Sequence, residues 1–506
     1  MSPETVTLLL VNIAGILERA DESLLPGVYK EVGAALNIDP TGLGSLTLFR
    51  CIVQSSCYPL AAYLATRHDR TFVIAIGAYL WAAATFLVAF SSTFFQVAVS
   101  RALNGVGLAI VIPAIQSLVA DSTEESTRGM AFGWLQLTGN MGAILGSICS
   151  VMIASTSFMG IPGWRLAFHL VGIISVAVGI LVQLFANDSR FANKPRSECV
   201  ITNTPFCSEL KEVLLEAKSV IRIPSFQIIV AQGVAGTFPW SGLSSFAPMW
   251  LELIGFSHET TAFLITMYVV GNSLGGLFGG KMGDILSKRL PNCGRIILSQ
   301  ISSGSAIPLA AILFLGLPND PSSSFKYGLV LFIMGLTTSW NAPATNNPIF
   351  AEIVPEKHRT SIYALDCSFE SILNSFAPPL VGILAQHVYG YKPIPEGSSE
   401  SAVIETDREN ATALAKALNI NFTITMTVCC AIYSFLYCTY PRDRERARMQ
   451  SLVESESQLM EGTSHSYKLP FSKLEKQDVE DETVMTAEYE GDKNDEKSLL
   501  ATQVHV

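Results

Sequence analysis

Residues 120–128 read ADSTEESTR, and residues 351–359, placed 231 positions later, read AEIVPEKHR. Both stretches have an alanine first, an acidic residue in the second and sixth positions and an arginine in the ninth. Each stretch follows a long apolar run. A pattern that recurs along the chain indicates an internal duplication, so the two stretches are expected to be equivalent loops in two halves of the chain.

A second pair of loops supports this duplication. Residues 62–70 read AYLATRHDR, and residues 280–284 read GKMGD, with further basic residues after it. Both segments lie two apolar runs before the loops of the first pair. Parallel repeats of this kind place a substrate site near the middle of the membrane, at the interface between the halves.

The chain is apolar enough to cross a membrane many times. Its mean hydropathy is +0.38, and only 15% of its residues are charged, whereas soluble domains carry about 25%. A helix needs about 20 apolar residues to cross the hydrocarbon core. Twelve segments qualify, near residues 5–30, 42–65, 72–93, 95–120, 129–155, 164–186, 225–252, 260–282, 295–317, 325–350, 360–388 and 418–440. The sequence therefore predicts an all-α membrane protein with twelve transmembrane helices in two six-helix halves.

The spacing of these segments also predicts how the chain is divided. The predicted parts are a first half at residues 1–187, a cytoplasmic linker at 188–224, a second half at 225–440 and a disordered, acidic cytoplasmic tail at 441–506. With the N-terminus inside, the inner loops and the stretch that follows the last span hold 19 basic residues, against six in the outer loops. Because basic residues concentrate on the cytoplasmic side, both termini are predicted to be cytoplasmic.

The net charge of −10 belongs mainly to the tail. Residues 449–506 hold 13 acidic and five basic residues, a composition that predicts disorder. The acidic balance argues against a nucleic-acid partner. Within the tail, Asp495 followed by Leu499 and Leu500 resembles an acidic dileucine sorting signal, which implies a sorting adaptor as a partner. That signal favours an endosomal or vacuolar membrane and leaves the plasma membrane open.

Ionisable residues inside predicted spans are candidates for function, because a charge in the membrane is costly. Eight of them form the predicted proton-coupling or substrate group: Glu18, Arg19, Asp21, Glu22, Arg50, Arg101, Asp366 and Glu370. Glu18, Asp21 and Glu22 share one helical face, since residues three and four apart are neighbours on a helix. Two interpretations stay open: a static ion-pair network that fixes helix packing, or acids that bind protons or substrate.

Two further spans combine aromatic rings with amides. The residues predicted to line a substrate cavity are Trp240, Phe246, Trp340, Asn341, Asn346 and Asn347. Amides supply hydrogen-bond donors and acceptors, and tryptophan supplies a flat apolar wall. The prolines and the Gly-Ser run of the segment at 238–250 predict a break or a kink there. The aromatic residues are equally consistent with ordinary helix packing.

The loop motifs resemble those of the major facilitator superfamily over about residues 5–445. Gly280-x-x-x-Asp284 matches the family's loop signature, whereas its counterpart has Ala62 for glycine and Thr66 for aspartate. The resemblance implies a cytoplasmic gate built from Arg67, Arg70, Asp121, Arg128, Asp284, Arg295, Glu352 and Arg359. The glycines Gly139, Gly142 and Gly146 are similar to an antiporter pattern of the family, and they would equally allow close helix packing.

A narrower resemblance is to the plant-type spinster-like branch of that family. It rests on Asn12, Glu18-Arg19 and Pro26, on Leu48-Phe49-Arg50, and on residues 364–370, which read ALDCSFE. The resemblance implies a monomeric, proton-coupled transporter of a small organic or amphiphilic solute, with a lysophospholipid or sphingolipid as the leading candidate. A sugar or other polar metabolite symporter is the alternative, and a transporter-fold receptor without net flux is another. No P-loop, GxSxG, HExxH or metal-ligand spacing occurs, so no enzyme, metal or cofactor is predicted.

Overall fold

The computed structural model describes residues 3–36, 40–154, 156–158, 160–188, 206–392 and 400–466. Its residues 1–452 form one compact unit, which contains all the contacts discussed below, and residues 453–506 form a second. The predicted sorting signal at Leu499 and Leu500 lies outside the described residues.

The first half of the compact unit is helical apart from one short hairpin. Its elements are α1 (Pro3–Gly27), α2 (Tyr29–Leu36), α3 (Pro40–Arg67), α4 (Arg70–Phe90), α5 (Phe94–Asp121), α6 (Arg128–Ala154), β1 (Ser157–Phe158), β2 (Ile161–Pro162) and α7 (Gly163–Phe185). The two strands pair antiparallel. Helix α8 (Phe206–Ile221) lies in the predicted linker.

The second half has helices of more varied length, interrupted by π-helical and 3₁₀-helical segments. Its elements are α9 (Pro224–Ile254), α10 (His258–Arg289), α11 (Gly294–Ala311), η2 (Ile312–Gly316), η3 (Pro321–Ser323), α12 (Ser324–Thr338), η4 (Asn341–Asn346), α13 (Asn347–Glu352), η5 (Glu356–His358), α14 (Arg359–Asn374), α15 (Ala377–Ile383), η6 (Leu384–Val388), α16 (Glu400–Tyr433) and α17 (Leu436–Ser466). Segments η2, η4 and η6 are π-helical, and η3 and η5 are 3₁₀-helical.

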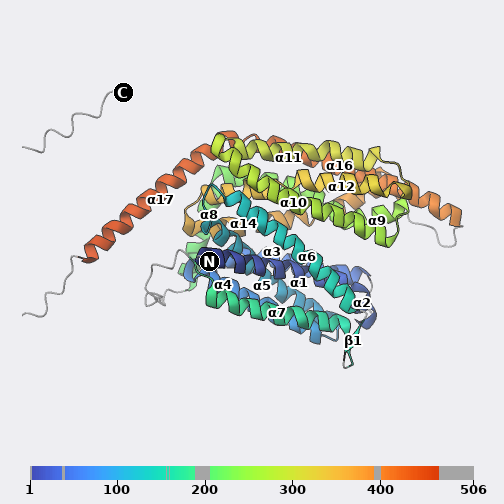
Figure 1. Ribbon diagram of the computed structural model, residues 1–506, viewed down its shortest axis with the longest axis horizontal. Helices are drawn as coiled ribbons and strands as arrows, with labels where there is room; N and C mark the ends of the chain where they lie inside the picture. The colour runs from blue at the N-terminus through green and yellow to red at the C-terminus, as the bar shows by residue number, and fades with distance from the viewer. Residues whose placement is uncertain are drawn as a thin grey trace, which may run out of the picture. The chain divides into compact units, whose positions relative to one another are not determined.

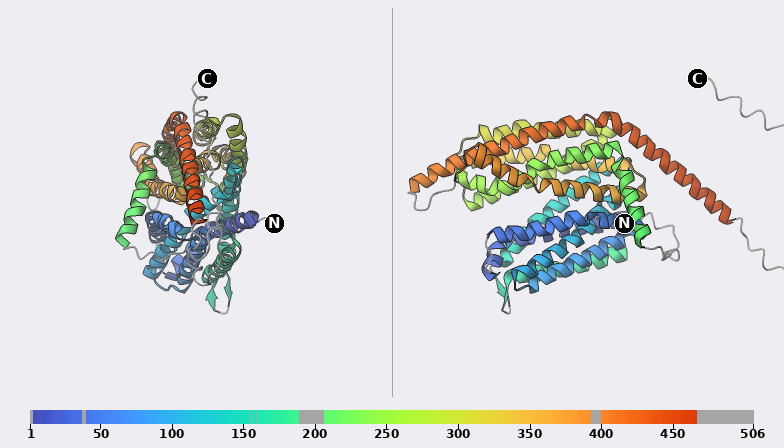
Figure 2. Two further views of the ribbon diagram at one scale, coloured as in Figure 1. Left: turned by 90° about the vertical axis from the view of Figure 1, so that its left-hand side faces the viewer. Right: turned by 180° about the vertical axis from the view of Figure 1, so that it is seen from behind.

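The helices are grouped by half, as the duplication predicts. In Figure 1 the helices of the first half, blue to teal, lie together, with those of the second half, green to orange, beside them, and Figure 2 shows the same grouping from behind. Helix α1 packs on α6 and α4 on α5 in the first half, while α10 packs on α12 and α9 on α16 in the second. The halves meet mainly where α6 contacts α10 and where α3 contacts α14.

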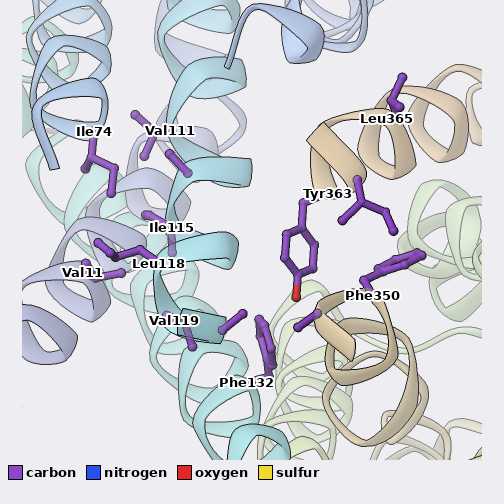
Figure 3. Packing of buried hydrophobic residues seen from close by; sticks show 14 of the residues in the cluster. Val11, Ile74, Val111, Ile115, Leu118, Val119, Phe132, Phe350, Tyr363 and Leu365 are labelled. Atoms are coloured by element: carbon purple, nitrogen blue, oxygen red, sulfur yellow. The ribbon is translucent and has the colours of Figure 1, made fainter. Parts of the chain in front are cut away.

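A buried apolar cluster joins the halves near the loops at 121–128 and 352–359, an end of the bundle that we call the loop end. Figure 3 shows Phe132 of α6 facing Phe350 and Tyr363 of the second half. The ring of Tyr363 lies 6.1 Å from that of Phe132 and 5.8 Å from that of Phe350. Burial of large aromatic side chains contributes strongly to packing, so the loop end is sealed by apolar contact as well as by charge.

Six helices within the described residues are long and apolar enough to span a membrane: 70–90, 94–121, 163–185, 259–289, 294–316 and 404–433. The other predicted spans depart from a simple apolar helix for physical reasons. Helix α1 carries four charged residues within five positions, and the predicted spans at 325–350 and 360–388 are divided into shorter helical segments. The total of twelve and the cytoplasmic position of both termini stay predictions.

The structure also differs from two local expectations. Helix α9 runs unbroken from Pro224 to Ile254 although it contains Pro239 and Pro248. Of the predicted break or kink in this span, the break is therefore wrong, and the kink stays a prediction. Helix α17 extends to Ser466, so the part of the predicted disordered tail up to that residue is helical.

Candidate functional site

The first half holds a network of opposite charges in the interior of the bundle. The Glu22 carboxylate lies 2.6 Å from Arg50 Nη1 through Oε1, and 3.0 Å from Arg19 Nη1 through Oε2. Arg50 also donates to Gln54 Oε1 at 2.6 Å, and Gln54 donates to the Tyr58 hydroxyl at 3.1 Å. These contacts tie α1 to α3 and pair the charges of Arg19, Glu22 and Arg50.

Asp21 is fully buried and held by three partners from two other helices. Thr85 Oγ1 donates to Asp21 Oδ1 at 2.6 Å, and Asn104 Nδ2 donates to Oδ2 at 2.8 Å. Arg101 Nη1 lies 3.8 Å from the same Oδ2. Asp21 therefore fixes the packing of α1 against α4 and α5, which agrees with the static interpretation for this residue.

Glu18 is the least satisfied acid of the first half. Its side chain is 6% exposed, and Oε2 lies 3.4 Å from Arg19 Nε. The other oxygen, Oε1, is buried without a hydrogen-bond partner among the described residues. Since a buried polar atom without a partner is costly, this oxygen is a place where a proton or a ligand group gains a partner.

In the interior of the second half, Asp366 and Glu370 have no basic partner among the described residues. Asp366 and Glu370 lie one turn apart on α14, and neither makes an ion pair or hydrogen bond with the described residues. Asp366 Oδ1 is buried, and the Glu370 carboxylate packs against Gly233 of α9, where a Cβ would lie 1.7 Å from Oε1. The acids of the first half are matched by arginines, whereas this pair is not.

The predicted aromatic wall of the cavity is mostly helix packing. The Trp240 ring is stacked on Tyr268, with centroids 5.5 Å apart, and meets Phe422 edge-on at 4.9 Å. Phe246 packs against the apolar cluster of the second half that contains Phe422. The Trp340 indole donates to the Leu336 carbonyl at 2.7 Å. Each of these rings therefore contacts residues of its own half.

The predicted asparagines lie in or beside the π-helical segment η4 and divide into two groups. Asn341 Nδ2 donates to Ser303 Oγ at 2.8 Å, and Asn346 Oδ1 accepts from the Tyr433 hydroxyl at 3.0 Å. The carbonyl of Asn347 accepts from the Tyr363 hydroxyl at 2.7 Å. Asn341 and Asn346 therefore belong to the interior of the second half, while Asn347 belongs to the loop end. Segments of π-helix often mark functional sites.

Two further amides lie inside predicted spans of the second half. Sequence reasoning missed Gln232, and it noted Asn374 only for its position one turn beyond Glu370. Gln232 of α9 accepts from Cys429 Sγ at 3.6 Å, and its own Nε2 is buried without a partner among the described residues. Asn374 Nδ2 donates to Thr237 Oγ1 at 2.5 Å, while its Oδ1 is unpaired in the described part of the chain. A single amide within an apolar run was the available signal, since each of these residues interrupts a predicted span.

The duplicated loops have equivalent geometry at the loop end. Arg128 Nε donates to the Ala120 carbonyl at 3.0 Å, and Arg359 Nε donates to the Ala351 carbonyl at 3.1 Å. Each arginine therefore binds the carbonyl of the alanine eight residues before it. This shared contact gives the sequence repeat a structural counterpart.

Ion pairs join the two halves at the same end. Asp121 pairs with Arg70 of its own half and with Arg359 of the other half. Arg70 also pairs with Asp188 at 2.5 Å, and the side chains of Arg70, Asp121 and Asp188 are fully buried. The first half therefore uses Asp121, rather than the loop position that Thr66 occupies, to bind the start of α14.

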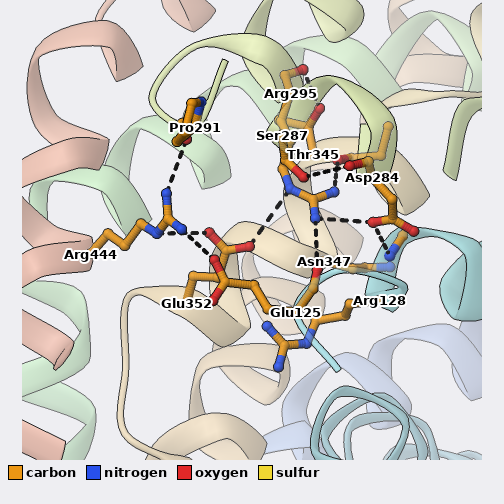
Figure 4. A network of polar contacts seen from close by, with 12 residues as sticks. Glu125, Arg128, Asp284, Ser287, Pro291, Arg295, Thr345, Asn347, Glu352 and Arg444 are labelled. Atoms are coloured by element: carbon orange, nitrogen blue, oxygen red, sulfur yellow. Dashed lines mark hydrogen bonds and ion pairs between the residues drawn. The ribbon is translucent and has the colours of Figure 1, made fainter. Parts of the chain in front are cut away.

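Asp284 plays the corresponding part in the second half. It accepts hydrogen bonds from the backbone N–H groups of Gly129 and Met130, at 2.9 and 2.8 Å, where α6 begins. Arg295 Nη2 lies 3.1 Å from Asp284 Oδ1, and Arg295 Nε lies 3.6 Å from Glu352 (Figure 4). A carboxylate at a helix N-terminus is stabilised by the free N–H groups and the helix dipole.

Among the predicted gate residues, Arg67 differs in its surroundings. Its guanidinium lies over the ring of Tyr63, one turn earlier on α3, with the centroid 5.4 Å away. The remaining predicted gate residues lie together at the loop end.

Close backbone contact completes the seal. A Cβ at Gly129 would lie 2.5 Å from the Gly280 carbonyl, and one at Gly133 would lie 2.8 Å from the Gly276 carbonyl. Asn140 of α6 donates to Ser273 of α10 at 3.0 Å, and among the described residues this is the hydrogen bond between these two helices that lies farthest from the loop end. The structure is therefore closed at the loop end.

The glycines of α6 that the sequence left ambiguous face α1. A Cβ at Gly142 would lie 2.2 Å from the Ile16 carbonyl, and one at Gly146 would lie 2.5 Å from the Ala20 carbonyl. Small residues allow this close helix approach. The packing interpretation accounts for both glycines.

A family model described as Major Facilitator Superfamily matches residues 11–378. The chain belongs to the Major Facilitator Superfamily. The predicted family is confirmed, and the protein is a multi-pass integral membrane protein.

Three known proteins illustrate what the chain is similar to. Protein spinster of Drosophila melanogaster is 23% identical over 399 residues, which is 76% of this chain and 62% of that protein. The match thus spans about three-fifths of that relative. A crystal structure of a bacterial homologue of the human lysosomal transporter Spinster, inward-facing and unoccupied, covers 88% of this chain and 99% of its own, with 18% identity and a TM-score of 0.56. The structure of the proton:xylose symporter XylE bound to 6-bromo-6-deoxy-D-glucose covers 86% of this chain and 95% of its own, with 15% identity and a TM-score of 0.63. The likeness to Spinster agrees with the resemblance of the motifs to the spinster-like branch.

Proposed function

We propose that this protein is a proton-coupled secondary active transporter that moves a small organic or amphiphilic solute by alternating access. The observation that carries the proposal is the acid pair Asp366 and Glu370, which has no basic partner among the described residues. Two unpaired carboxylates one turn apart in a membrane interior are costly when both are charged. Proton binding removes that cost, and the pair would take up and release protons as it becomes exposed to one side of the membrane or the other.

The closed loop end supports the alternating-access part of the proposal. With both termini in the cytoplasm, the loop end is the cytoplasmic gate, and Asp121, Asp284 and Arg359 hold it shut. The interior charges near Glu18 and Glu370 would then face the opposite side in this state. Opening requires breaking the contacts between halves, while the contacts within each half, such as those of Asp21, persist.

The leading substrate class is a lysophospholipid or sphingolipid, which the likeness to Spinster supports. A polar metabolite such as a sugar is the second candidate, and a specific observation favours it. Gln232 Nε2, Asn341 Oδ1 and Asn374 Oδ1 are buried amide atoms without partners among the described residues. Hydroxyl groups of a polar solute would satisfy such atoms.

The test uses the purified full chain in liposomes with an imposed pH gradient. Lysophosphatidylcholine and xylose serve as the two probes, and Glu370→Gln and Asp366→Asn are compared with Glu259→Gln at the exposed start of α10. Gradient-driven uptake should be lost in the first two variants and retained in the third. Exchange without a gradient should persist in Glu370→Gln, since a neutral amide still permits the gate to cycle.

Several results would contradict the proposal. Full gradient-driven uptake in both acid variants would remove the assigned coupling role. Saturable binding of a probe with no uptake under any gradient would favour a transporter-fold receptor without flux.

A further inference from the structure

A cavity of about 410 Å³ opens at the loop end, between the two halves. Its charged lining residues are Glu125, Arg128, Glu352, Arg359, Arg444 and Arg448. Glu125 and Arg128 come from the loop between α5 and α6 and the start of α6, and the others from the second half. Four arginines against two glutamates make this cavity basic.

The two acids of the cavity are already engaged. Glu125 pairs with Arg444, and lies 3.2 Å from Arg448. Although burial alone would raise the pKa of Glu125, these two guanidinium groups hold it below its usual value. Glu352 lies 3.6 Å from both Arg295 Nε and Arg444 Nε.

Arg128 makes no ion pair with either of these two acids, which bind other arginines. Its side chain is nine-tenths buried, with 7% exposed, and its only hydrogen bond to the described residues goes from Nε to the Ala120 carbonyl. No carboxylate of the described residues lies within ion-pair distance of it, and Figure 4 shows Arg128 without a dashed line to any carboxylate, while Glu125 pairs with Arg444. Its repeat equivalent, Arg359, makes the same backbone contact and also pairs with Asp121.

This difference between equivalent arginines points to an anion as the partner of Arg128. A buried charge is costly unless it is paired and hydrogen-bonded, and removal from water is expensive even for good pairs. The planar guanidinium donates in a fork that matches the oxygens of phosphate. Arg128, Arg359 and Arg448 all face the same cavity.

We propose that this cavity binds a phosphate-bearing anion, either free in the cytoplasm or on a lipid headgroup, and that Arg128 is its central ligand. Because Arg128 belongs to the first half and Arg359 and Arg448 to the second, the bound anion bridges the halves and stabilises the closed gate. The cavity lining does not include Asp366 or Glu370, so anion binding can be measured without a proton gradient.

The experiment measures binding to the full-length protein in detergent and in lipid nanodiscs. Inorganic pyrophosphate at constant ionic strength is the free probe, and nanodiscs with or without phosphatidylinositol phosphate supply the headgroup. Arg128→Gln retains a donor for the Ala120 carbonyl, and Arg128→Lys retains the charge without the fork. Arg289→Gln removes an exposed charge at the end of α10 and is the matched control.

The wild type should bind at least one probe saturably, with a rise in melting temperature as the probe concentration increases. Arg128→Gln should weaken that binding about tenfold or more, as loss of a charge-assisted contact does. Arg128→Lys should give an intermediate value, and Arg289→Gln should stay within about twofold of wild type. Binding of pyrophosphate identifies a free anion, and binding in phosphoinositide nanodiscs alone identifies a headgroup.

Three results would overturn the proposal. They are the absence of saturable binding of both probes to the wild type, equal weakening by Arg128→Gln and Arg289→Gln, and unchanged binding in Arg128→Gln. If Arg128→Gln fails to fold, Arg128→Lys decides, because binding equal to wild type in that variant rules out recognition by the fork.

Discussion

Replacing Asp284 by asparagine should open the loop end of the bundle. The carboxylate accepts backbone hydrogen bonds from Gly129 and Met130 of the other half, at 2.9 and 2.8 Å. Asparagine retains one acceptor oxygen, while its NH₂ group faces the second N–H donor. The favourable interaction of a charge with the start of α6 is lost as well.

The size of the effect follows from these contacts. A hydrogen bond to a charged group contributes about 1.5–3 kcal/mol, and the helix N-terminus adds about 0.3–1 kcal/mol. Since part of the interaction remains, the loss specific to the closed state is about 2–3 kcal/mol, or roughly a 30- to 150-fold shift of the closed-to-open ratio. The contact of Asp284 with Arg295 lies within one half and does not distinguish the two states.

Hydrogen–deuterium exchange measures this shift directly. Amide exchange at Gly129 and Met130, whose N–H groups bind Asp284 across the two halves, should accelerate by about the same 30- to 150-fold factor, because exchange through an opening step follows the open population. Glu259→Gln, at the far end of the same helix α10, serves as the control and should leave the exchange of these two amides unchanged. Wild-type exchange rates in Asp284→Asn would refute the assignment of Asp284 as a contact that holds the gate closed.

Two further outcomes test the packing and the linker. Gly142→Ala places a Cβ 2.2 Å from the Ile16 carbonyl, whereas the Cβ of Gly304→Ala meets nothing closer than 3.9 Å. Only the first variant should therefore lower the melting temperature, through overpacking worth about 1–3 kcal/mol. Equal melting temperatures of the two variants would contradict the close approach of α1 and α6. Burial alone would raise the pKa of Glu216, but hydrogen bonds, first among them that with His358 at 2.8 Å, lower it below the usual 4.5. The contact is therefore complete above about pH 4.5 and is lost as the pH falls through the lowered value. Amide exchange in α8 should rise only in acid for the wild type and be already raised at neutral pH in Glu216→Gln; identical profiles would show that this contact does not hold α8.

The duplicated loop pattern was sufficient to predict which arginines are equivalent. Arg128 and Arg359 do make the same contact with the backbone eight residues earlier, since a local spacing determines a local hydrogen bond. The partner of Arg359 was not predictable in this way. Asp121 lies 238 residues away, in the other half, and its position depends on how two bundles dock.

In the interior of the second half, too, some features were predictable from the sequence and others were not. The unpaired acids Asp366 and Glu370 were visible as charges in an apolar segment, because their cost depends on composition alone. The role of Trp240 was not predictable, since the sequence pattern is the same whether a ring in a membrane span packs on other helices or faces a cavity. Its contacts with Tyr268 and Phe422 arise only after three helices are assembled.

Within the described residues, the ion pairs between the halves lie at one end, which gives the protein a sidedness toward salt. Glu125 and Arg448 are 45% and 51% exposed, whereas the pair of Asp121 with Arg359 is almost entirely buried. Ions screen exposed pairs much more than buried ones. Raising ionic strength on the side that faces the loop end therefore weakens only the outer part of the seal, and the same salt added to the opposite side leaves it intact. In vesicles, this one-sided response reports which way each molecule is inserted.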